Sequence, residues 1–260
     1  MFSLHTLFLK SVPVGSYTLK VPKDLLFAFN DGEYEEKNVV YWLDRIFSSI
    51  GKPVTLYDVG ANCGYFVLRF SHAARHIYAF EPVRRTYSIL TQNIRLNGLK
   101  NAAAFKVGLS DVDGEAVIQK YSSSGNNSLF RRTLPPGHPV RRTGKERITT
   151  ARLDTLFTRH SLIPPDVVKI DTEGAELFVL KGARRVIEVH RPFICMEFAD
   201  STYRDAGYST TDVLEELERL EYEIRGLSSD YNDRKLYSQR EFDGLVVSNI
   251  IAIPKGSVLK

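Results

Sequence analysis

The sequence predicts an α/β fold in which a mostly parallel sheet carries helices on both faces. The first observation is an apolar run at residues 54–59 that stops at a glycine-rich turn. The second is another apolar run at 77–80, which follows an amphipathic segment and ends on Glu81. The third is the alternation of strand-like and helix-like patterns along the rest of the chain, which is typical of parallel sheets.

Residues 1–50 are expected to form an N-terminal extension of strand and helix that acts as a lid over the substrate. Residues 12–21 alternate like a strand, interrupted by a proline and a glycine. Residues 35–50 have helical spacing, because their apolar side chains recur on one side, and a glycine and a proline then end the helix.

Residues 51–260 are expected to form the main domain. The helix at 83–96 has its apolar side chains on one face and is stopped by the Asn-Gly pair that follows. The helix at 212–220 starts with Asp212 and Glu215, a spacing that resembles a capping box. Helices are expected at 64–73, 83–96, 153–160, 174–189 and 212–220, and strands at 54–59, 77–80, 102–107, 114–120, 146–151, 166–170, 193–196 and 246–253.

A basic insertion loop is expected at residues 121–145, which are rich in Ser, Asn, Pro, Gly and Arg. Loops of this length inside a domain are often functional lids or disordered. As a lid, the loop would favour phosphate or carboxylate groups on a substrate. The alternative is a solvated basic loop, and His138 within it is the histidine most open to a catalytic role. The basic residues are Arg131, Arg132, Arg141, Arg142 and Lys145.

The composition is that of an ordinary soluble globular chain, with 260 residues, 43% hydrophobic and 25% charged. Its longest apolar runs are about five residues, far too short to span a bilayer. The net charge of +4 fits an anionic substrate but does not imply nucleic acid. Two cysteines form no disulfide framework and favour a reducing, cytoplasmic location. The first ten residues lack the pattern of a signal peptide and are expected in the mature protein.

The glycine-rich turn is the best indicator of a cofactor. It reads D-x-G-x-N-x-G, formed by Asp58, Gly60, Asn62 and Gly64, and Glu81 follows 23 positions after Asp58. Glycines let the backbone approach a nucleotide-like ligand, and the acid accepts hydrogen bonds from a ribose diol. The pattern differs from the G-x-G-x-x-G of dinucleotide sites, and a carboxylate there would repel a pyrophosphate but accept bonds from an ammonium group. S-adenosylmethionine is therefore favoured over NAD, and a turn that binds nothing is the remaining alternative.

A second group of acids follows the fourth core strand. Asp171, Glu173 and Glu176 lie within six residues at the edge where the cofactor should sit, and Glu197 ends the next strand. Glu173 and Glu176 would also suit the first turn of the helix that follows. Asp171 ends its strand and is expected to line the active site.

Six sequence blocks now carry a resemblance. In chain order, within residues 54–198, they are DVGANCGYF, AFEP, NGLKN…VGLSD, RLDTLF, VKIDTEGAELFVLKGA and RPFICMEF. Together they resemble the FkbM-type family of S-adenosylmethionine-dependent methyltransferases. The resemblance implies a class I methyltransferase (Rossmann-like) fold with a mostly parallel seven-stranded sheet. It also implies O-methylation of a hydroxyl on a saccharide or natural-product small molecule.

The resemblance assigns roles to the matching positions. The turn would hold the methionine part and the ribose of S-adenosylmethionine, and Glu81 would bind the ribose hydroxyls. Asp171 would stand near the sulfonium and the acceptor. Pro82 and Val83 would pack near the adenine, and Ser110 and Asp111 would lie at its far edge. The cofactor-binding residues implied are Asp58, Gly60, Asn62, Gly64, Glu81, Pro82, Ser110, Asp111 and Asp171.

Methyl transfer to a weakly nucleophilic hydroxyl gains from a base that takes the acceptor proton. Asp171 is the first choice for this base, and Glu173, Glu176 and Glu197 are the alternatives. No metal is predicted. Asp171, Glu173 and Glu197 could supply oxygen ligands to Mg²⁺, but nothing in their spacing demands it.

The expected partner is a small-molecule or saccharide hydroxyl acceptor, anionic if the basic loop takes part. An RNA methyltransferase is an alternative, although no RNA-binding module is visible and the basic residues are confined to one segment. A non-catalytic protein that keeps the fold is another, and the intact turn argues against it. NAD-dependent oxidoreduction is the fourth and least favoured function. The oligomeric state is not predicted.

Overall fold

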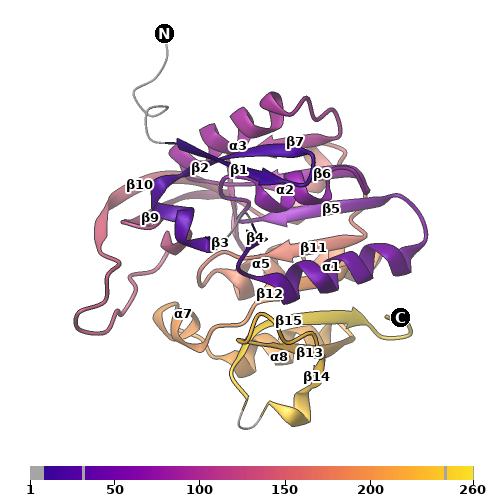
Figure 1. The fold of residues 1–260 in the computed structure, drawn as a ribbon. Helices are drawn as coiled ribbons and strands as arrows, with labels where there is room; N and C mark the ends of the chain where they lie inside the picture. Colours follow the sequence, from indigo (N-terminus) through magenta and orange to yellow (C-terminus); the bar gives the residue numbers. More distant parts are fainter. Residues whose placement is uncertain (1–8, 31–32, 243–244, 260) are drawn as a thin grey trace.

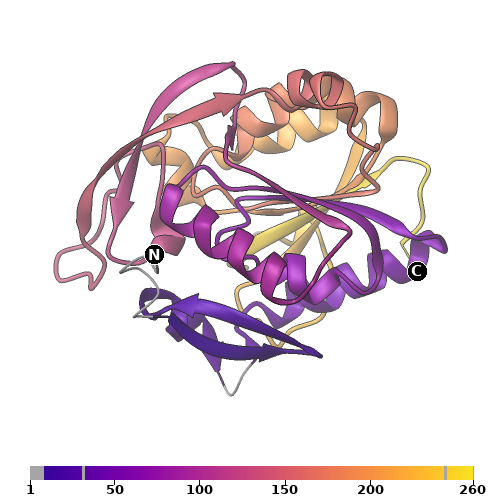
Figure 2. The same cartoon turned by 90° about the horizontal axis from the view of Figure 1, so that it is seen from above.

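The computed structural model of the chain describes residues 9–30, 33–242 and 245–259. The expectation for the first ten residues therefore falls almost entirely outside the described part. Within it, a large sheet lies between two helical layers (Figures 1 and 2). Among the helices of these residues, none combines the length and the apolar character that crossing a bilayer requires.

The strands of the central sheet are β5 Val54–Val59, β6 Ala74–Phe80, β7 Ala102–Phe105, β11 Val167–Ile170, β12 Phe193–Glu197, β13 Tyr222–Ser228, β14 Tyr237–Ser238 and β15 Val247–Pro254. Over the described residues their order is β14-β13-β15-β12-β11-β5-β6-β7. The strands from β12 to β7 are parallel, whereas β15 is antiparallel to both of its neighbours. The α/β prediction is confirmed, but the sheet has eight strands rather than seven, because the two-residue β14 pairs with β13.

Helices pack on both faces of the sheet and bury the inner strands from both sides. The helices are α1 Lys37–Ile50, α2 Tyr65–Phe70, α3 Arg84–Leu96, α4 Leu153–Arg159, α5 Glu176–Gly182, α6 Arg184–His190, α7 Asp200–Asp205 and α8 Thr210–Arg219. All residues of β5 are buried. Leu56 belongs to the core formed with α1, α2 and α3, whereas Tyr57 belongs to the core formed with α4, α5, α6 and α8.

Two of the departures from the predicted helices have a local physical reason. The single helix expected at 174–189 is broken into α5 and α6. A Cβ at Gly182 would lie 1.9 Å from the carbonyl oxygen of Ser110, so the chain needs a glycine there, and a glycine weakens a helix. Helix α8 begins earlier than expected, because its capping box is formed by Ser209 and Asp212 rather than by Asp212 and Glu215.

The two strands expected at residues 114–120 and 146–151 are present and pair with each other, but they belong to a separate sheet. This sheet consists of β8 Gly108–Leu109, β9 Gly114–Tyr121 and β10 Arg142–Ala151, in the order β8-β10-β9. It stands at the left of Figure 1. Because β10 begins at Arg142, it takes up the last residues of the expected basic loop, and the short helix η3 Ser124–Asn126 takes up others.

The N-terminal segment folds as β1 Leu9–Val14, β2 Tyr17–Pro22, the short helix η2 Lys23–Ala28, β3 Phe29–Asn30 and β4 Glu33–Tyr34. The strand pattern at 12–21 is thus a hairpin that turns at Gly15, whose φ is 57°. Asn93 of α3 fixes this hairpin, since its side chain accepts from the Lys20 amide at 2.8 Å and donates to the Lys20 carbonyl at 2.9 Å. Its amide also donates to the Cys63 carbonyl at 2.7 Å, which ties the hairpin to the glycine-rich turn.

Candidate functional site

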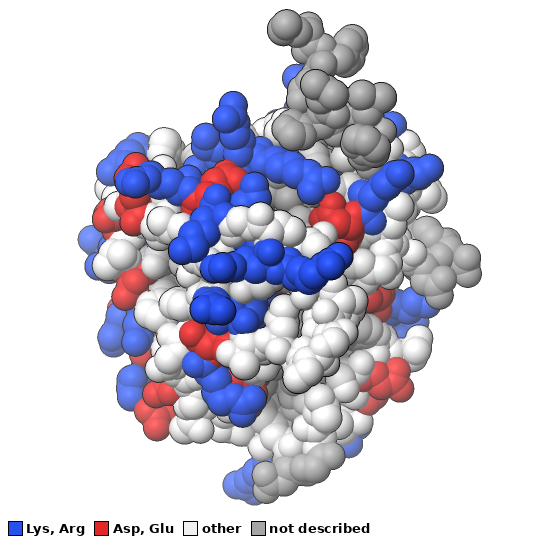
Figure 3. All heavy atoms as spheres, turned by 90° about the vertical axis from the view of Figure 1, so that its left-hand side faces the viewer, with Lys and Arg blue, Asp and Glu red and all other residues white. Residues whose placement is uncertain are grey.

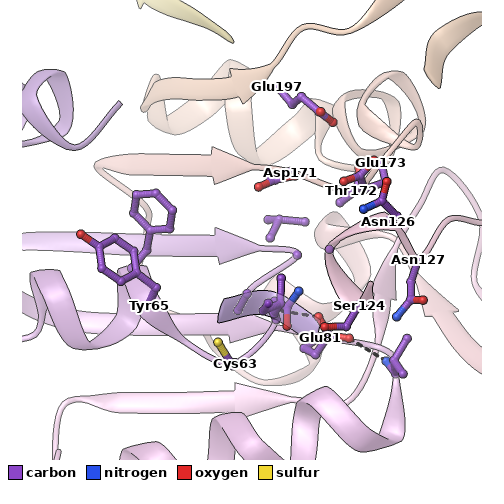
Figure 4. Close-up of a pocket in the computed structure, with 18 of the residues that line it drawn as sticks. Cys63, Tyr65, Glu81, Ser124, Asn126, Asn127, Asp171, Thr172, Glu173 and Glu197 are labelled. Carbon is purple, nitrogen blue, oxygen red and sulfur yellow. Dashed lines mark hydrogen bonds between the residues drawn. The ribbon is translucent and has the colours of Figure 1, made fainter. Parts of the chain in front are cut away.

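A cavity of about 300 Å³ lies at the carboxyl ends of β5, β6, β11 and β12 (Figure 4). Parallel sheets bind ligands at this edge, because each strand delivers its following residues to the same place. The predicted site residues that line the cavity are Gly60, Asn62, Glu81, Pro82, Val83, Asp171, Glu173 and Glu197. The remaining predicted residues, which are absent from its lining, are Asp58, Gly64, Ser110, Asp111 and Glu176.

The turn after β5 needs its glycines. Gly60 has a φ of 84°, and a Cβ there would lie 1.7 Å from the carbonyl oxygen of Asp171. Gly64 has a φ of 92°, and its Cβ would lie 2.6 Å from Cδ1 of Leu90. The turn is therefore in close contact with Asp171, the residue that follows β11. The glycine-rich turn and the acids that follow β11 thus meet at one place.

Glu81 is held by three donors. Its Oε2 accepts from the Asn62 amide at 3.0 Å, and its Oε1 accepts from the Val83 amide at 2.8 Å and the Thr86 hydroxyl at 2.7 Å. Burial raises the pKa of Glu81 to about 7, although these hydrogen bonds oppose the shift. The carboxylate is thus fixed in orientation and keeps acceptor capacity on the cavity side (Figure 4).

Asp58 and Asn62 have acceptors that the protein does not satisfy. Asp58 is 1% exposed, and neither of its carboxylate oxygens has a hydrogen-bond partner in the described residues. Burial raises its pKa to about 6. The Oδ1 atom of Asn62, on the cavity wall, is likewise buried without a partner. Because buried acceptors are costly unless donors reach them, this turn fits a ligand with ammonium and hydroxyl donors, as S-adenosylmethionine has.

An apolar slot borders Glu81. Val83, Ile118 and Ile148 form a small core, and these three side chains also line the cavity. Such a slot suits the flat face of a purine. Ser110 and Asp111, expected at the far edge of the adenine, lie instead against α5 near Gly182. Their chain neighbours Gly108 and Leu109 line the cavity.

Three carboxylates converge on the opposite side of the cavity. Asp171, Glu173 and Glu197 each offer an oxygen within 4.8 Å of the others. The sequence suggests that Glu173 belongs to the first turn of α5, but the residue precedes that helix and has a φ of 56°. Its side chain forms an ion pair with Arg132. Burial raises the pKa of Glu173 to about 8 despite Arg132, and burial with neighbouring acids raises the pKa of Glu197 well above its usual range.

Glu176 has a structural role. It is fully buried, and its Oε1 accepts from both the amide and the hydroxyl of Thr172, at 2.7 and 2.8 Å. Its Oε2 accepts from the Gly174 amide at 2.9 Å. These bonds close the loop between β11 and α5 and orient the residues before it. Both oxygens of Glu176 accept hydrogen bonds from the loop, and the residue is absent from the cavity wall. The carboxylates that remain as candidates for a general base are those of Asp171, Glu173 and Glu197.

Sequence reasoning missed two charged residues of the site. Lys169 is 4% exposed, and its Nζ lies 2.9 Å from Asp171 Oδ2 and 4.4 Å from the Phe66 ring centroid. Burial opposes its charge, but Asp171 and Asp58 outweigh burial and raise its pKa. A lysine inside the apolar strand VVKI is the signal that could have revealed it. Glu36, which also lines the cavity, precedes α1 and carries no comparable signal.

The N-terminal segment and the insertion loop meet over the cavity. Oδ2 of Asp24 in η2 accepts from the Ser124 amide of η3 at 2.8 Å, and Oδ1 pairs with Arg85 of α3 at 3.1 Å. Residues of both short helices line the cavity. None of the basic side chains of the described loop lines the cavity, and neither does His138. Figure 3 shows lysines and arginines gathered on the outer face that carries β9 and β10.

The strand order, the glycine turn, the acid after β6 and the cavity together define a class I methyltransferase fold. A solved structure of methyltransferase FkbM from Methylobacillus flagellatus KT has a TM-score of 0.50 and 17% identity. The match covers 77% of this chain and 43% of that one, and it supports the fold alone. The predicted fold class is confirmed.

The family follows from the sequence comparison. Residues 58–224 match the methyltransferase FkbM domain. The chain therefore belongs to the FkbM methyltransferase family, as the six blocks predicted.

Three relatives show how far the likeness extends. Hexuronic acid methyltransferase AglP of Haloferax volcanii is 31% identical, over 67% of this chain and 66% of its own. Methyltransferase 1 of Beauveria bassiana is 28% identical, over 49% of this chain and 57% of its own. The chain thus spans less than two thirds of either relative. The 2-O-methyltransferase NoeI of Sinorhizobium fredii is 25% identical, over 72% of this chain and 82% of its own.

Proposed function

We propose that the protein is an S-adenosylmethionine-dependent O-methyltransferase that acts on a hydroxyl of a saccharide or natural-product small molecule. Family membership supports methyl transfer, the name of AglP supports a saccharide acceptor, and the name of NoeI supports transfer to oxygen. The observation that carries the proposal is the contact at Gly60, which joins the turn suited to the cofactor to the backbone of Asp171.

In this proposal each side of the cavity has its own task. The cofactor supplies an activated methyl group. Glu81 accepts from the ribose hydroxyls and Asn62 accepts from donors of the methionine part, while the buried Asp58 adds negative charge from behind the cavity wall. The apolar slot of Val83, Ile118 and Ile148 holds the adenine, with Gly108 and Leu109 rather than Ser110 and Asp111 at its edge. Gly64 shapes the turn from behind the cavity wall.

Asp171 is the proposed general base, and Glu173 and Glu197 are the alternatives. It lies on the cavity wall beside the turn, and Lys169 fixes its carboxylate from one side. A base in this position takes the hydroxyl proton as the oxygen attacks the methyl carbon. Orientation of the acceptor and exclusion of water supply much of the remaining acceleration. No step requires a metal.

The proposal includes two broader points. The N-terminal segment (residues 1–50), through η2, and the insertion within domain 51–260, through η3, act as a lid, supported by the Asp24 contacts. A cytoplasmic location is supported by Cys63 and Cys195, which are both buried and free.

The decisive experiment is Asp171→Asn. We expect S-adenosylhomocysteine affinity to stay near normal and turnover with an accepted saccharide to fall by roughly a hundredfold or more. Calorimetry would measure the first and product quantitation the second. Asp200→Asn, a change in an exposed ion pair on α7, is the control. A fully active Asp171→Asn enzyme would remove Asp171 as the base.

A cofactor titration tests the enzyme class separately. Micromolar binding of S-adenosylhomocysteine without binding of NAD is the expected result. Binding of NAD alone would support oxidoreduction instead, and binding of neither would favour a non-catalytic protein. Salt-sensitive binding of generic RNA would return the RNA methyltransferase alternative to consideration.

A further inference from the structure

The half of the cavity that faces away from the apolar slot has a distinct charge pattern. We call it the acceptor chamber and define it by Glu36, Asp171, Glu173, Glu197 and Tyr231, which all line the cavity. Asp171, Glu173 and Glu197 each offer an oxygen within 4.8 Å of the others, and Glu36 and Tyr231 line the same cavity. Figure 4 shows Glu197 and Glu173 on the same side, across from Glu81.

The cations near this chamber are already paired. Among the described residues, Lys169 is the single basic side chain on the cavity wall, and it is bound to Asp171. Arg132 is paired with Glu173. The other basic residues of the insertion loop, among them Arg131, Arg141 and Lys145, are exposed outside the cavity.

Two carboxyl groups of the chamber lack an ion-pair partner of their own among the described residues. Glu36 and Glu197 form no ion pair in the described part of the chain, and the Oε2 atom of each is buried without a hydrogen-bond partner. Burial raises the pKa of both carboxyls, so they already resist ionisation. An acceptor that brought a carboxylate into this chamber would add negative charge where the dielectric is low, and that carboxylate would offer no donor to either atom. Hydroxyl or ammonium donors would satisfy them.

Aromatic rings complete the wall. Tyr34 and Tyr65 are stacked, with ring centroids 4.4 Å apart and an interplanar angle of 24°, and both line the cavity. Flat rings of this kind offer an apolar surface that can pack against the C–H face of a pyranose.

We propose that the acceptor chamber takes a neutral or amine-bearing saccharide and rejects a uronic acid. The inference rests on the proposed O-methyltransferase function and narrows its substrate class. It departs from the anionic acceptor that the basic loop favours by sequence. It also separates this chain from the relative whose name specifies hexuronic acid.

The test compares three acceptors of one ring configuration: methyl glucoside, methyl glucosaminide and methyl glucuronide. With the full chain, S-adenosylmethionine and a chelator present, we expect kcat/KM for the first two to exceed that for the glucuronide by about tenfold or more. The double variant Glu36→Gln/Glu197→Gln removes the charges and keeps the shape, so it should narrow this ratio. Glu115→Gln, on an exposed strand, should leave the ratio unchanged. A glucuronide that reacts as well as the others would overturn the proposal.

A binding measurement keeps this inference separate from the proposed function. Each glycoside is titrated by NMR into protein saturated with S-adenosylhomocysteine. Binding of the glucoside or glucosaminide, but not the glucuronide, supports the chamber assignment even if no acceptor is methylated, and that outcome would count against O-methylation alone. Binding of none, or equal binding of all three, would refute the chamber assignment.

Discussion

Glu81 has its three hydrogen bonds in place before any ligand arrives. Two of them come from backbone amides on either side of the site, those of Asn62 in the turn and Val83 before α3. The carboxylate therefore links the two loops that frame the ribose in the proposed cofactor site. A preorganised acceptor of this kind binds a diol without a further ordering cost.

We predict that Glu81→Gln weakens S-adenosylhomocysteine binding by about 1–3 kcal/mol, the scale of a hydrogen bond to a charged group. Because the pKa of Glu81 is raised to about 7, protonation below that pH removes the charge that accepts the ribose donors. Affinity of the unaltered protein should thus rise as pH increases through about 7, and the variant should lose this dependence. Calorimetry across that range measures both, and an unchanged affinity would contradict the ribose assignment.

At single positions, the sequence predicts what local chemistry dictates. The glycines of the turn and Glu81 are identified by spacing, because a tight turn and an acid at a strand end have local signatures. Glu36 and Lys169 are not, because they reach the site through the pairing of distant segments. The role of Glu176 is also invisible in sequence, since only the loop geometry shows that its carboxylate is occupied by Thr172 and Gly174.

Secondary-structure elements are likewise predicted where the local pattern is strong and missed where distant contacts decide. Strands with continuous apolar runs, such as β5 and β11, are predicted to within a residue or two. β13 carries Glu223 and Arg225 on its exposed side and a glycine at 226, so its pattern is diluted and the prediction omits it. The expected helix at 174–189 breaks because of a contact with Ser110, which periodicity cannot reveal.

The lid elements give a prediction at this scale. Asp24→Asn removes the ion pair to Arg85 and weakens the bond to the Ser124 amide, so η2 and η3 should separate more readily. We expect S-adenosylhomocysteine to dissociate faster, by about two- to tenfold, the effect of losing one partly buried polar contact of about 0.5–1.5 kcal/mol. Stopped-flow dissociation measures it, with Asp200→Asn as the control. An unchanged rate would argue against a lid role.

The whole molecule concentrates buried acids around one cavity. Burial raises the pKa of Asp58 to about 6, of Glu36 and Glu81 to about 7, and of Glu173 to about 8. At Glu36 and Asp58, the charge of Asp171 adds to this rise in pKa and the charge of Lys169 opposes it. Such a site is electrostatically costly when empty, and a ligand that carries positive charge offsets part of this cost.

This arrangement predicts how stability depends on pH. The folded protein holds protons on these carboxyls at pH values where the unfolded chain has released them, so the free energy of unfolding should fall as pH rises from about 5 to about 8. Saturating S-adenosylmethionine should reduce this fall. Thermal unfolding with and without the cofactor measures both. A ligand-free melting temperature that rises across this range would contradict the buried-acid description.

The position of β15 has a consequence for how the chain is made. Among the described strands, β13 joins β12 and the parallel strands through β15, which is synthesised after β13 and pairs between β12 and β13. During translation, the parallel strands and their helices can assemble early, since domains generally fold from the N-terminal side. β12 then presents an unpaired edge until β15 leaves the ribosome. Nascent chains of this enzyme should therefore depend on chaperones that shield exposed strands.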